Sequence, residues 1–270
     1  MKFSRLFSKR VLFRLLFAIN FIQILKANSY KLGSFLPFIT GNFIEKDGFV
    51  LSNYGVWMQR NYSDKTFYLS ILGYRNTLEK HLKLIRKPFI FFDVGSNQGV
   101  FSLLASKNMY CKQLHIFEPN SNLIRYLSAN LNFNKVTGYK VHNYAISDKI
   151  GNISFFVPAS HSGAARIMEN EGVDTFCESV NREYLNEVGK YIADPIFLKV
   201  DVEGSEFLVL TEIFNSLLFE RVEYVFIEMN SNFGNTENTA KLLLERGFIE
   251  VSRKGTKESF DALYLKKPVD

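Results

Sequence analysis

Two acids and two glycines are spaced to hold a cofactor that contains a nucleoside. The segment Asp93-Val-Gly-Ser-Asn-Gln-Gly99 follows an apolar run, and Glu118 ends a second apolar run. Glycines between a strand and a helix let the backbone turn tightly and approach a ligand, while the helix offers free N–H groups. An acid at the end of the next strand can accept hydrogen bonds from both ribose hydroxyls of an adenosine.

A second group of acids lies in the block Lys199-Val-Asp-Val-Glu-Gly-Ser-Glu206. On an extended strand, Lys199, Asp201 and Glu203 face one side, and open α/β sheets bind ligands at this end of their strands. Asp201 or Glu203 can act as a general base, with Lys199 keeping a neighbouring carboxylate ionised. Together with Glu228, these two acids are instead candidate ligands for a divalent metal. The alternative interpretation is that the acids cap the following helix.

The elements that must position these residues alternate along the chain. Helices are predicted at 98–107, 121–131, 182–192, 206–218 and 236–246. Strands are predicted at 89–93, 113–118, 139–144, 195–201, 222–228, 248–253 and 262–266, with an extra strand at 153–157. Repeated strand–helix units predict an α/β fold whose seven-stranded sheet is mostly parallel, with helices on both faces. The final hairpin adds one antiparallel strand.

Two segments outside this alternation have weaker patterns. Residues 42–60 are predicted to form short strands around the turn Asp47-Gly48, and residues 66–86 have helical spacing that breaks near Gly73. Residues 160–180 have no clear pattern and are predicted to form a long loop. This loop contains His161, a candidate general base, although a solvated loop histidine is the other interpretation.

Four blocks of the sequence, in order, resemble the FkbM family of methyltransferases. They are residues 93–102, Phe117-Glu-Pro119 with the asparagines that follow it, Ala145-Ile-Ser-Asp148, and residues 198–206. The resemblance covers roughly residues 88–230. It implies a Rossmann-like class I methyltransferase fold, S-adenosyl-L-methionine (SAM) as cofactor, and O-methylation of a saccharide or other glycan hydroxyl. The residues that it implies for cofactor binding are Asp93, Gly95, Asn97, Gly99, Glu118, Pro119 and Ser147.

Two other functions stay open beside SAM-dependent methyl transfer. A nicotinamide-dependent oxidoreductase also uses a glycine-rich turn and a ribose-binding acid, but its fingerprint has a third glycine that residues 93–99 lack. A non-catalytic SAM- or glycan-binding subunit of a membrane-associated assembly needs no base, so the carboxylates at 201, 203 and 206 argue against it. A sugar hydroxyl is a very weak acid, and methylating it requires the proton removal that Asp201 or Glu203 can supply.

Composition narrows the class of partner and compartment. The net charge of +6 comes from residues 1–31, which hold seven basic residues and no acid, and the rest of the chain sums to about −1. The basic balance therefore belongs to a tail, and we expect no nucleic-acid partner. Two isolated cysteines give no disulfide framework or zinc site and fit a reducing compartment, so we expect a cytoplasmic protein.

The N-terminal segment is basic and apolar, and its role is open. The apolar run 15–25 is interrupted by polar residues and is too short to cross a bilayer, which takes about 20 residues. Residues 1–26 are predicted to contact a membrane surface or a partner protein, to pack on the chain itself, or to act as a signal or anchor. We predict an N-terminal helix or extension at 1–31, accessory strands and a helix at 32–87, and a methyltransferase domain at 88–270.

Overall fold

The computed structural model describes residues 43–73, 77–168 and 175–268. These residues divide into two compact units. Of the described residues, the first unit holds 43–73 and 159–163, and the second holds the remainder. The predicted N-terminal helix lies outside the described residues, and among those described no helix is long and apolar enough to cross a bilayer. The three domain ranges expected from the sequence stay a prediction.

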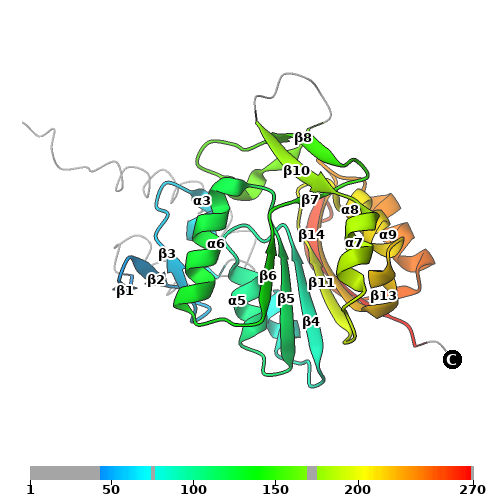
Figure 1. Ribbon diagram of the computed structural model, residues 1–270, viewed down its shortest axis with the longest axis horizontal. Coiled ribbons are helices and arrows are strands. Elements are labelled where there is room, and N and C mark those ends of the chain that lie inside the picture. Colours follow the sequence, from blue (N-terminus) through cyan, green and yellow to red (C-terminus); the bar gives the residue numbers. More distant parts are fainter. Residues whose placement is uncertain (1–42, 74–76, 169–174, 269–270) are drawn as a thin grey trace, which may run out of the picture. The chain divides into compact units, whose positions relative to one another are not determined.

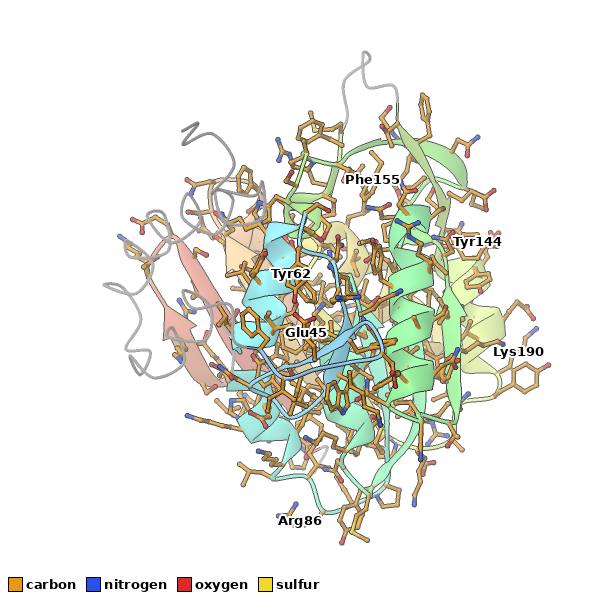
Figure 2. The ribbon with its side chains drawn as sticks, turned by 90° about the vertical axis from the view of Figure 1, so that its left-hand side faces the viewer. Glu45, Tyr62, Arg86, Tyr144, Phe155 and Lys190 are labelled. Carbon is orange, nitrogen blue, oxygen red and sulfur yellow. The ribbon has the colours of Figure 1, made fainter. Side chains whose placement is uncertain are left out.

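The first unit is a three-stranded antiparallel sheet followed by a helix. Its strands are β1 (Glu45–Lys46), β2 (Phe49–Leu51) and β3 (Trp57–Gln59), and its helix is α3 (Lys65–Leu72). Asp47 and Gly48 both have positive φ angles, as a tight hairpin turn requires, so the predicted turn is confirmed. Figure 2 labels Glu45 and Tyr62, whose hydroxyl donates a hydrogen bond to the Glu45 carboxylate.

Residues 159–163 join the first unit through the N-terminus of α3. The Asp64 side chain accepts a hydrogen bond from the backbone N–H of Thr66 and so caps the helix. The same carboxylate accepts hydrogen bonds from the backbone N–H and the hydroxyl of Ser162, at 3.0 and 2.5 Å. Part of the segment predicted as a loop is therefore held by an acid distant in sequence.

The second unit is built around a seven-stranded sheet. Its order is β13-β14-β12-β11-β4-β5-β6. Strand β14 runs antiparallel to both of its neighbours, β12 and β13, and the other pairs are parallel, which confirms the mostly parallel sheet with one reversed strand. The strands are β4 (Phe89–Val94), β5 (Cys111–Phe117), β6 (Tyr139–His142), β11 (Ile196–Val200), β12 (Val222–Asn230), β13 (Phe248–Gly255) and β14 (Ser259–Lys266).

Helices cover both faces of this sheet, as predicted. Figure 1 shows α5 and α6 on one side and α7, α8 and α9 on the other. Strands β4 and β11 are buried along their whole length because both of their faces are covered. The helices of this unit are α4 (Thr77–Leu82), α5 (Val100–Ser106), α6 (Ser121–Phe133), α7 (Arg182–Gly189), α8 (Glu206–Phe214) and α9 (Thr236–Glu245), with a 3-10 turn at Leu217–Arg221.

A second, four-stranded sheet corrects the expected long loop at 160–180. Its order is β7-β10-β8-β9, from β7 (Ala145–Ile146), β8 (Gly151–Phe156), β9 (Arg166–Ile167) and β10 (Phe176–Val180). Strand β10 alternates exposed Phe176 and Glu178 with buried Cys177 and Ser179. Its inward side chains are small and weakly hydrophobic, so the period-two pattern of a strand was hard to detect.

Candidate active site

The glycine turn after β4 packs directly against the end of β11. Gly95, Asn97 and Gly99 all have positive φ angles, which glycine adopts freely and asparagine tolerates. A Cβ atom on Gly95 would lie 1.9 Å from the carbonyl oxygen of Asp201. The backbone N–H groups of Gly95 and Ser96 donate to the Phe117 carbonyl at 3.0 and 3.1 Å. Three neighbouring strand ends are thus joined at this turn.

Asp93 supports the turn from inside the protein. Its side chain is 0% exposed, and it accepts a hydrogen bond from the Ser102 hydroxyl at 2.6 Å. The Lys199 ammonium lies 3.1 Å from its other carboxylate oxygen. The sequence grouped Asp93 with the residues that bind the cofactor. The structure buries Asp93 completely, and its cofactor role stays a prediction.

Lys199 joins the turn to β11. Its ammonium donates to the Gly95 carbonyl at 2.6 Å and lies 3.8 Å from the Asp201 carboxylate. Burial lowers the pKa of Lys199, but attraction to Asp93 and Asp201 outweighs that effect and raises the pKa above its ordinary value. Lys199 is therefore a positioning residue whose charge is held between two carboxylates, and its nearer partner is Asp93.

Glu118 extends from the end of β5 to the glycine turn. One of its carboxylate oxygens accepts from the Asn97 N–H at 2.7 Å, and the other accepts from the Asn120 N–H at 2.8 Å. Burial raises the pKa of Glu118 to about 7, although both N–H bonds favour the charged form. Each carboxylate oxygen has a second lone pair. These two acceptor oxygens therefore fit the two hydroxyl donors of a ribose.

Pro119 lies next to Glu118 in a loop that is supported by Asn143, a residue that the sequence analysis did not identify. The Asn143 amide donates to the carbonyls of Glu118 and Pro119 at 2.8 and 3.2 Å. Nothing in the sequence pattern marks Asn143, because its role depends on two strand ends meeting. Ser147 follows β7 and is buried, and its side chain forms hydrogen bonds with the neighbouring residues Asp148 and Lys149. Its cofactor role stays a prediction.

The predicted acids do gather beside the turn. Asp201, Glu203 and Glu228 each offer a carboxylate oxygen, and these atoms lie within 4.8 Å of one another. Two of the acids follow β11 and the third stands on β12, so adjacent strand ends bring them together. Glu203 has a φ of +53°, a left-handed conformation that costs a non-glycine residue about 1–2 kcal/mol. The cluster has the chemistry of a proton acceptor or a ligand set for a hard cation.

Glu206 stabilises the acidic turn and is itself shielded from solvent. It is 5% exposed and accepts a hydrogen bond from the Gly204 N–H at 2.9 Å. Burial raises its pKa, opposed by the backbone N–H groups that bind it. Glu206 thus holds the loop through the Gly204 N–H.

His161 belongs to the first unit, in the segment 159–163. Its ring is partly buried, and burial followed by repulsion from Lys65 lowers its pKa, with Asp64 acting in the opposite direction. The structure places it with α3 rather than among the residues of the second unit described above. Its role as a general base stays a prediction.

Comparisons with known proteins assign this constellation to a family. Hexuronic acid methyltransferase AglP of Haloferax volcanii is 26% identical over 189 residues, which cover 70% of this chain and 75% of that protein. TrmK of M. capricolum, solved with S-adenosyl-homocysteine, is 12% identical with a TM-score of 0.45, covering 70% of this chain and 67% of that chain.

A further solved structure is the precorrin-6y C5,15-methyltransferase of Geobacter metallireducens. It is 11% identical with a TM-score of 0.42, covering 73% of this chain and 89% of that chain. Residues 93–250 match the methyltransferase FkbM domain, a span of more than half the chain. The match begins at Asp93 and includes the turn, Glu118 and all three clustered acids. The chain therefore belongs to the FkbM family of methyltransferases.

Proposed function

We propose that this protein transfers the methyl group of SAM to a hydroxyl of a saccharide. The observation that carries the proposal is the contact between the glycine turn and the acids that follow β11. The turn that suits a nucleoside meets the acids that suit a proton acceptor where Gly95 packs against the Asp201 backbone. The saccharide is supported by the relative AglP, whose name specifies a hexuronic acid methyltransferase.

The cofactor end of the site binds and orients SAM. SAM supplies an electrophilic methyl group attached to a sulfonium. Glu118 accepts hydrogen bonds from the ribose hydroxyls. It uses the lone pairs that remain after its carboxylate has accepted the N–H groups of Asn97 and Asn120. Gly95, Asn97 and Gly99 keep the backbone of the turn close to the ligand. Lys199 holds that backbone from the buried side by donating to the Gly95 carbonyl, and Asp93 pairs with Lys199.

The acceptor end removes a proton. A sugar hydroxyl becomes a competent nucleophile as it loses its proton, and Asp201 or Glu203 is the proposed acceptor of that proton. The hydroxyl oxygen forms its bond to the methyl carbon while the carbon–sulfur bond breaks, and the proton moves to the carboxylate. Asp201 is 22% exposed, so it is open to an incoming acceptor while Lys199 supports it from the buried side. Correct alignment of donor and acceptor supplies much of the remaining rate enhancement.

A divalent cation held by Asp201, Glu203 and Glu228 is the alternative use of the same carboxylates. A chelator separates the two mechanisms. With a carboxylate as base, we expect methyl transfer at an unchanged rate after treatment with EDTA. A loss of activity that Mg²⁺ or Mn²⁺ restores would assign the acids to a cation.

The function as a whole is tested in two steps. Calorimetry with SAM should show binding to the protein, and a Glu118→Ala variant should bind much more weakly. The protein is then incubated with isotope-labelled SAM and a saccharide library, and mass spectrometry identifies labelled products. Absence of SAM binding by the wild-type protein would contradict the proposal. Binding without transfer to any saccharide would favour the non-catalytic subunit.

The proposal also keeps a role for residues 1–26 as a contact to a membrane surface or a partner protein. Seven basic residues without an acid over 1–31 would be attracted to anionic lipid. Sedimentation of the full chain with vesicles containing phosphatidylserine tests this, with a chain lacking residues 1–26 as the control. Equal sedimentation of the two chains would remove the membrane contact.

A further inference from the structure

Arg166 has an unusual setting on the short strand β9. Its guanidinium carbon lies 5.1 Å from the centre of the Phe156 ring and 5.3 Å from the centre of the Phe233 ring. Both rings are partly exposed, at 37% and 53%. Within the part of the chain that the structure describes, no carboxylate lies within ion-pair distance of this guanidinium. The guanidinium is thus held by two aromatic rings, and its N–H groups remain available to another partner.

Phe233 places this guanidinium beside the acidic turn. A Cβ atom on Gly204 would lie 2.7 Å from the Phe233 carbonyl oxygen and 3.2 Å from its Cβ. A Cβ atom on the next residue, Gly234, would lie 2.9 Å from the Glu206 carboxylate. The loop that carries Phe233 therefore packs against residues 204–206, directly after Glu203. Arg166 contacts the Phe233 ring, and the backbone of Phe233 packs on Gly204, the residue after Glu203.

The chemistry of a ring-bound guanidinium favours recognition of a planar anion. Cation–π contacts use the face of the guanidinium and fix its plane, while the N–H groups along its edge remain available. That edge matches a carboxylate through two parallel hydrogen bonds. One guanidinium carries one positive charge, which balances a carboxylate. A phosphate carries about −1.5 to −2 charges and would be left with excess negative charge beside the acids at 201, 203 and 228.

The acids give this recognition an orienting effect. A carboxylate brought next to Asp201, Glu203 or Glu228 would be repelled, whereas Arg166 beside the Phe233 ring offers a compensating positive charge. An acidic sugar would therefore lie with its carboxylate toward Arg166 and a ring hydroxyl toward the proposed base. We propose that Arg166 binds the carboxylate of a uronic acid residue in the acceptor and determines specificity for it. This inference rests on the proposed function.

Binding of matched trisaccharides tests the inference. The probes are trigalacturonate and the neutral trisaccharide made from it by carboxyl reduction, titrated calorimetrically with S-adenosyl-homocysteine present. We expect the protein to bind trigalacturonate at least about tenfold more tightly, the effect of one charged hydrogen-bonded contact. Arg166→Gln should remove that preference and leave binding of the neutral trisaccharide unchanged. Arg166→Lys keeps the charge without the planar edge and should retain part of the preference.

A second arginine provides the matched control. Arg125 on α6 lies over the Tyr126 ring at 4.8 Å, so Arg125→Gln removes a similar cation–π pair at an exposed position. That variant should bind both trisaccharides as the wild type does. Equal affinity of the wild type for the two probes, no binding of trigalacturonate, or an equal loss for both probes in Arg166→Gln would overturn the inference.

Methyl transfer on the same samples separates this inference from the proposed function. Transfer to both trisaccharides at equal rates would support the saccharide methyltransferase and remove the role of Arg166. Binding that depends on Arg166, without transfer to either trisaccharide, would support carboxylate recognition and count against the proposed function.

Discussion

The two ends of the candidate site treat charge in opposite ways. At the cofactor end, Asp93 and Lys199 are 0% and 1% exposed, and each has a partner of opposite charge. At the acceptor end, three carboxylates approach within 4.8 Å and one of them sits on a strained backbone. Compensated buried charges make a rigid frame, whereas neighbouring like charges and strain are typical of groups that react.

Lys199 is the residue that belongs to both ends. It donates to the turn carbonyl of Gly95 and lies near the carboxylates of Asp93 and Asp201. The buried ion pair therefore extends to Asp201, the first of the proposed proton acceptors. The difference between the ends predicts that substitutions at the acceptor end change rate, while substitutions at the cofactor end change stability and cofactor affinity.

The largest effect is expected at the acceptor end. Asp201→Asn removes the proposed proton acceptor but keeps the shape of the side chain. We expect kcat to fall about 10²- to 10⁴-fold, the usual contribution of a general base. The free energy of unfolding should change by only about 1 kcal/mol, because Asp201 is partly exposed. Single-turnover kinetics and denaturant unfolding measure the two quantities.

Glu187→Gln is the matched control for this prediction. Glu187 on α7 pairs with Lys190, which directly follows the helix and is labelled in Figure 2, and both side chains are exposed. In the Glu187→Gln variant, neither kcat nor the free energy of unfolding should change measurably. If Asp201→Asn kept full activity and Glu203→Gln did the same, the acids would not be the proton acceptors.

At the cofactor end, Lys199→Met should mainly reduce stability. Loss of the ammonium leaves the Asp93 carboxylate buried without compensation, which costs about 3–5 kcal/mol. The double variant Lys199→Met with Asp93→Asn removes the stranded charge and should recover part of that loss. Urea unfolding of the wild type and the two variants checks this. A double variant less stable than Lys199→Met alone would show that the two residues do not form the expected pair.

The contact between the two ends is tested by Gly95→Ala. An added methyl would meet the Asp201 carbonyl oxygen at 1.9 Å, in a backbone with φ of +77°. Left-handed strain and overpacking together should cost about 3 kcal/mol and weaken SAM binding. Gly247→Ala is the control, since it has a similar φ of +84° and nothing within 4 Å. Equal losses in the two variants would mean that the close approach of the turn is unimportant.

The smallest effect is a pH dependence of cofactor binding. The pKa of Glu118 is raised to about 7, and only its ionised form accepts both ribose hydroxyls. SAM affinity should therefore fall as the pH drops through 7, by about tenfold between pH 8 and pH 6. Calorimetry across this range measures it, and Glu118→Gln should bind weakly with no such dependence.

The free energy of unfolding should decrease as the pH rises, whereas SAM affinity increases. A carboxyl whose pKa is raised on folding contributes stability when protonated, and this contribution is lost as the pH rises from about 4.5 through 7. Unfolding of the cofactor-free protein at several pH values checks the sign. Stability that rose with pH in the wild type but not in Glu118→Gln would contradict the burial of this acid.

The sequence alone predicted much of the fold and of the cofactor end. Continuous apolar runs identified the buried strands. The acid–glycine turn and Glu118 were predicted to form one site, and the Asn97 N–H of that turn does donate to Glu118, while ligand binding there stays a prediction. These signals are local, because each strand and turn contains its own pattern. The acid cluster was also predictable, since strands in the same sheet bring their carboxyl ends together.

Features that depend on distant partners were missed or misplaced. The contacts of Asp93 with Ser102 and Lys199 were not predicted, because they depend on a helix and a strand that lie elsewhere in the sequence. Strand β10 was expected to be loop, because its inward residues are small. Arg166 gave no signal in the sequence, since its meaning depends on Phe156 and Phe233 meeting it in space.

The most direct test of the central claim is transfer of an isotope-labelled methyl group from SAM to a saccharide. The protein and its Asp201→Asn variant are compared on the same acceptor, and nuclear magnetic resonance locates the label. The proposed function predicts a new methyl ether on a sugar hydroxyl, formed by the wild type and lost in the variant. SAM binding with no label on any saccharide, or equal labelling by the variant, would contradict it.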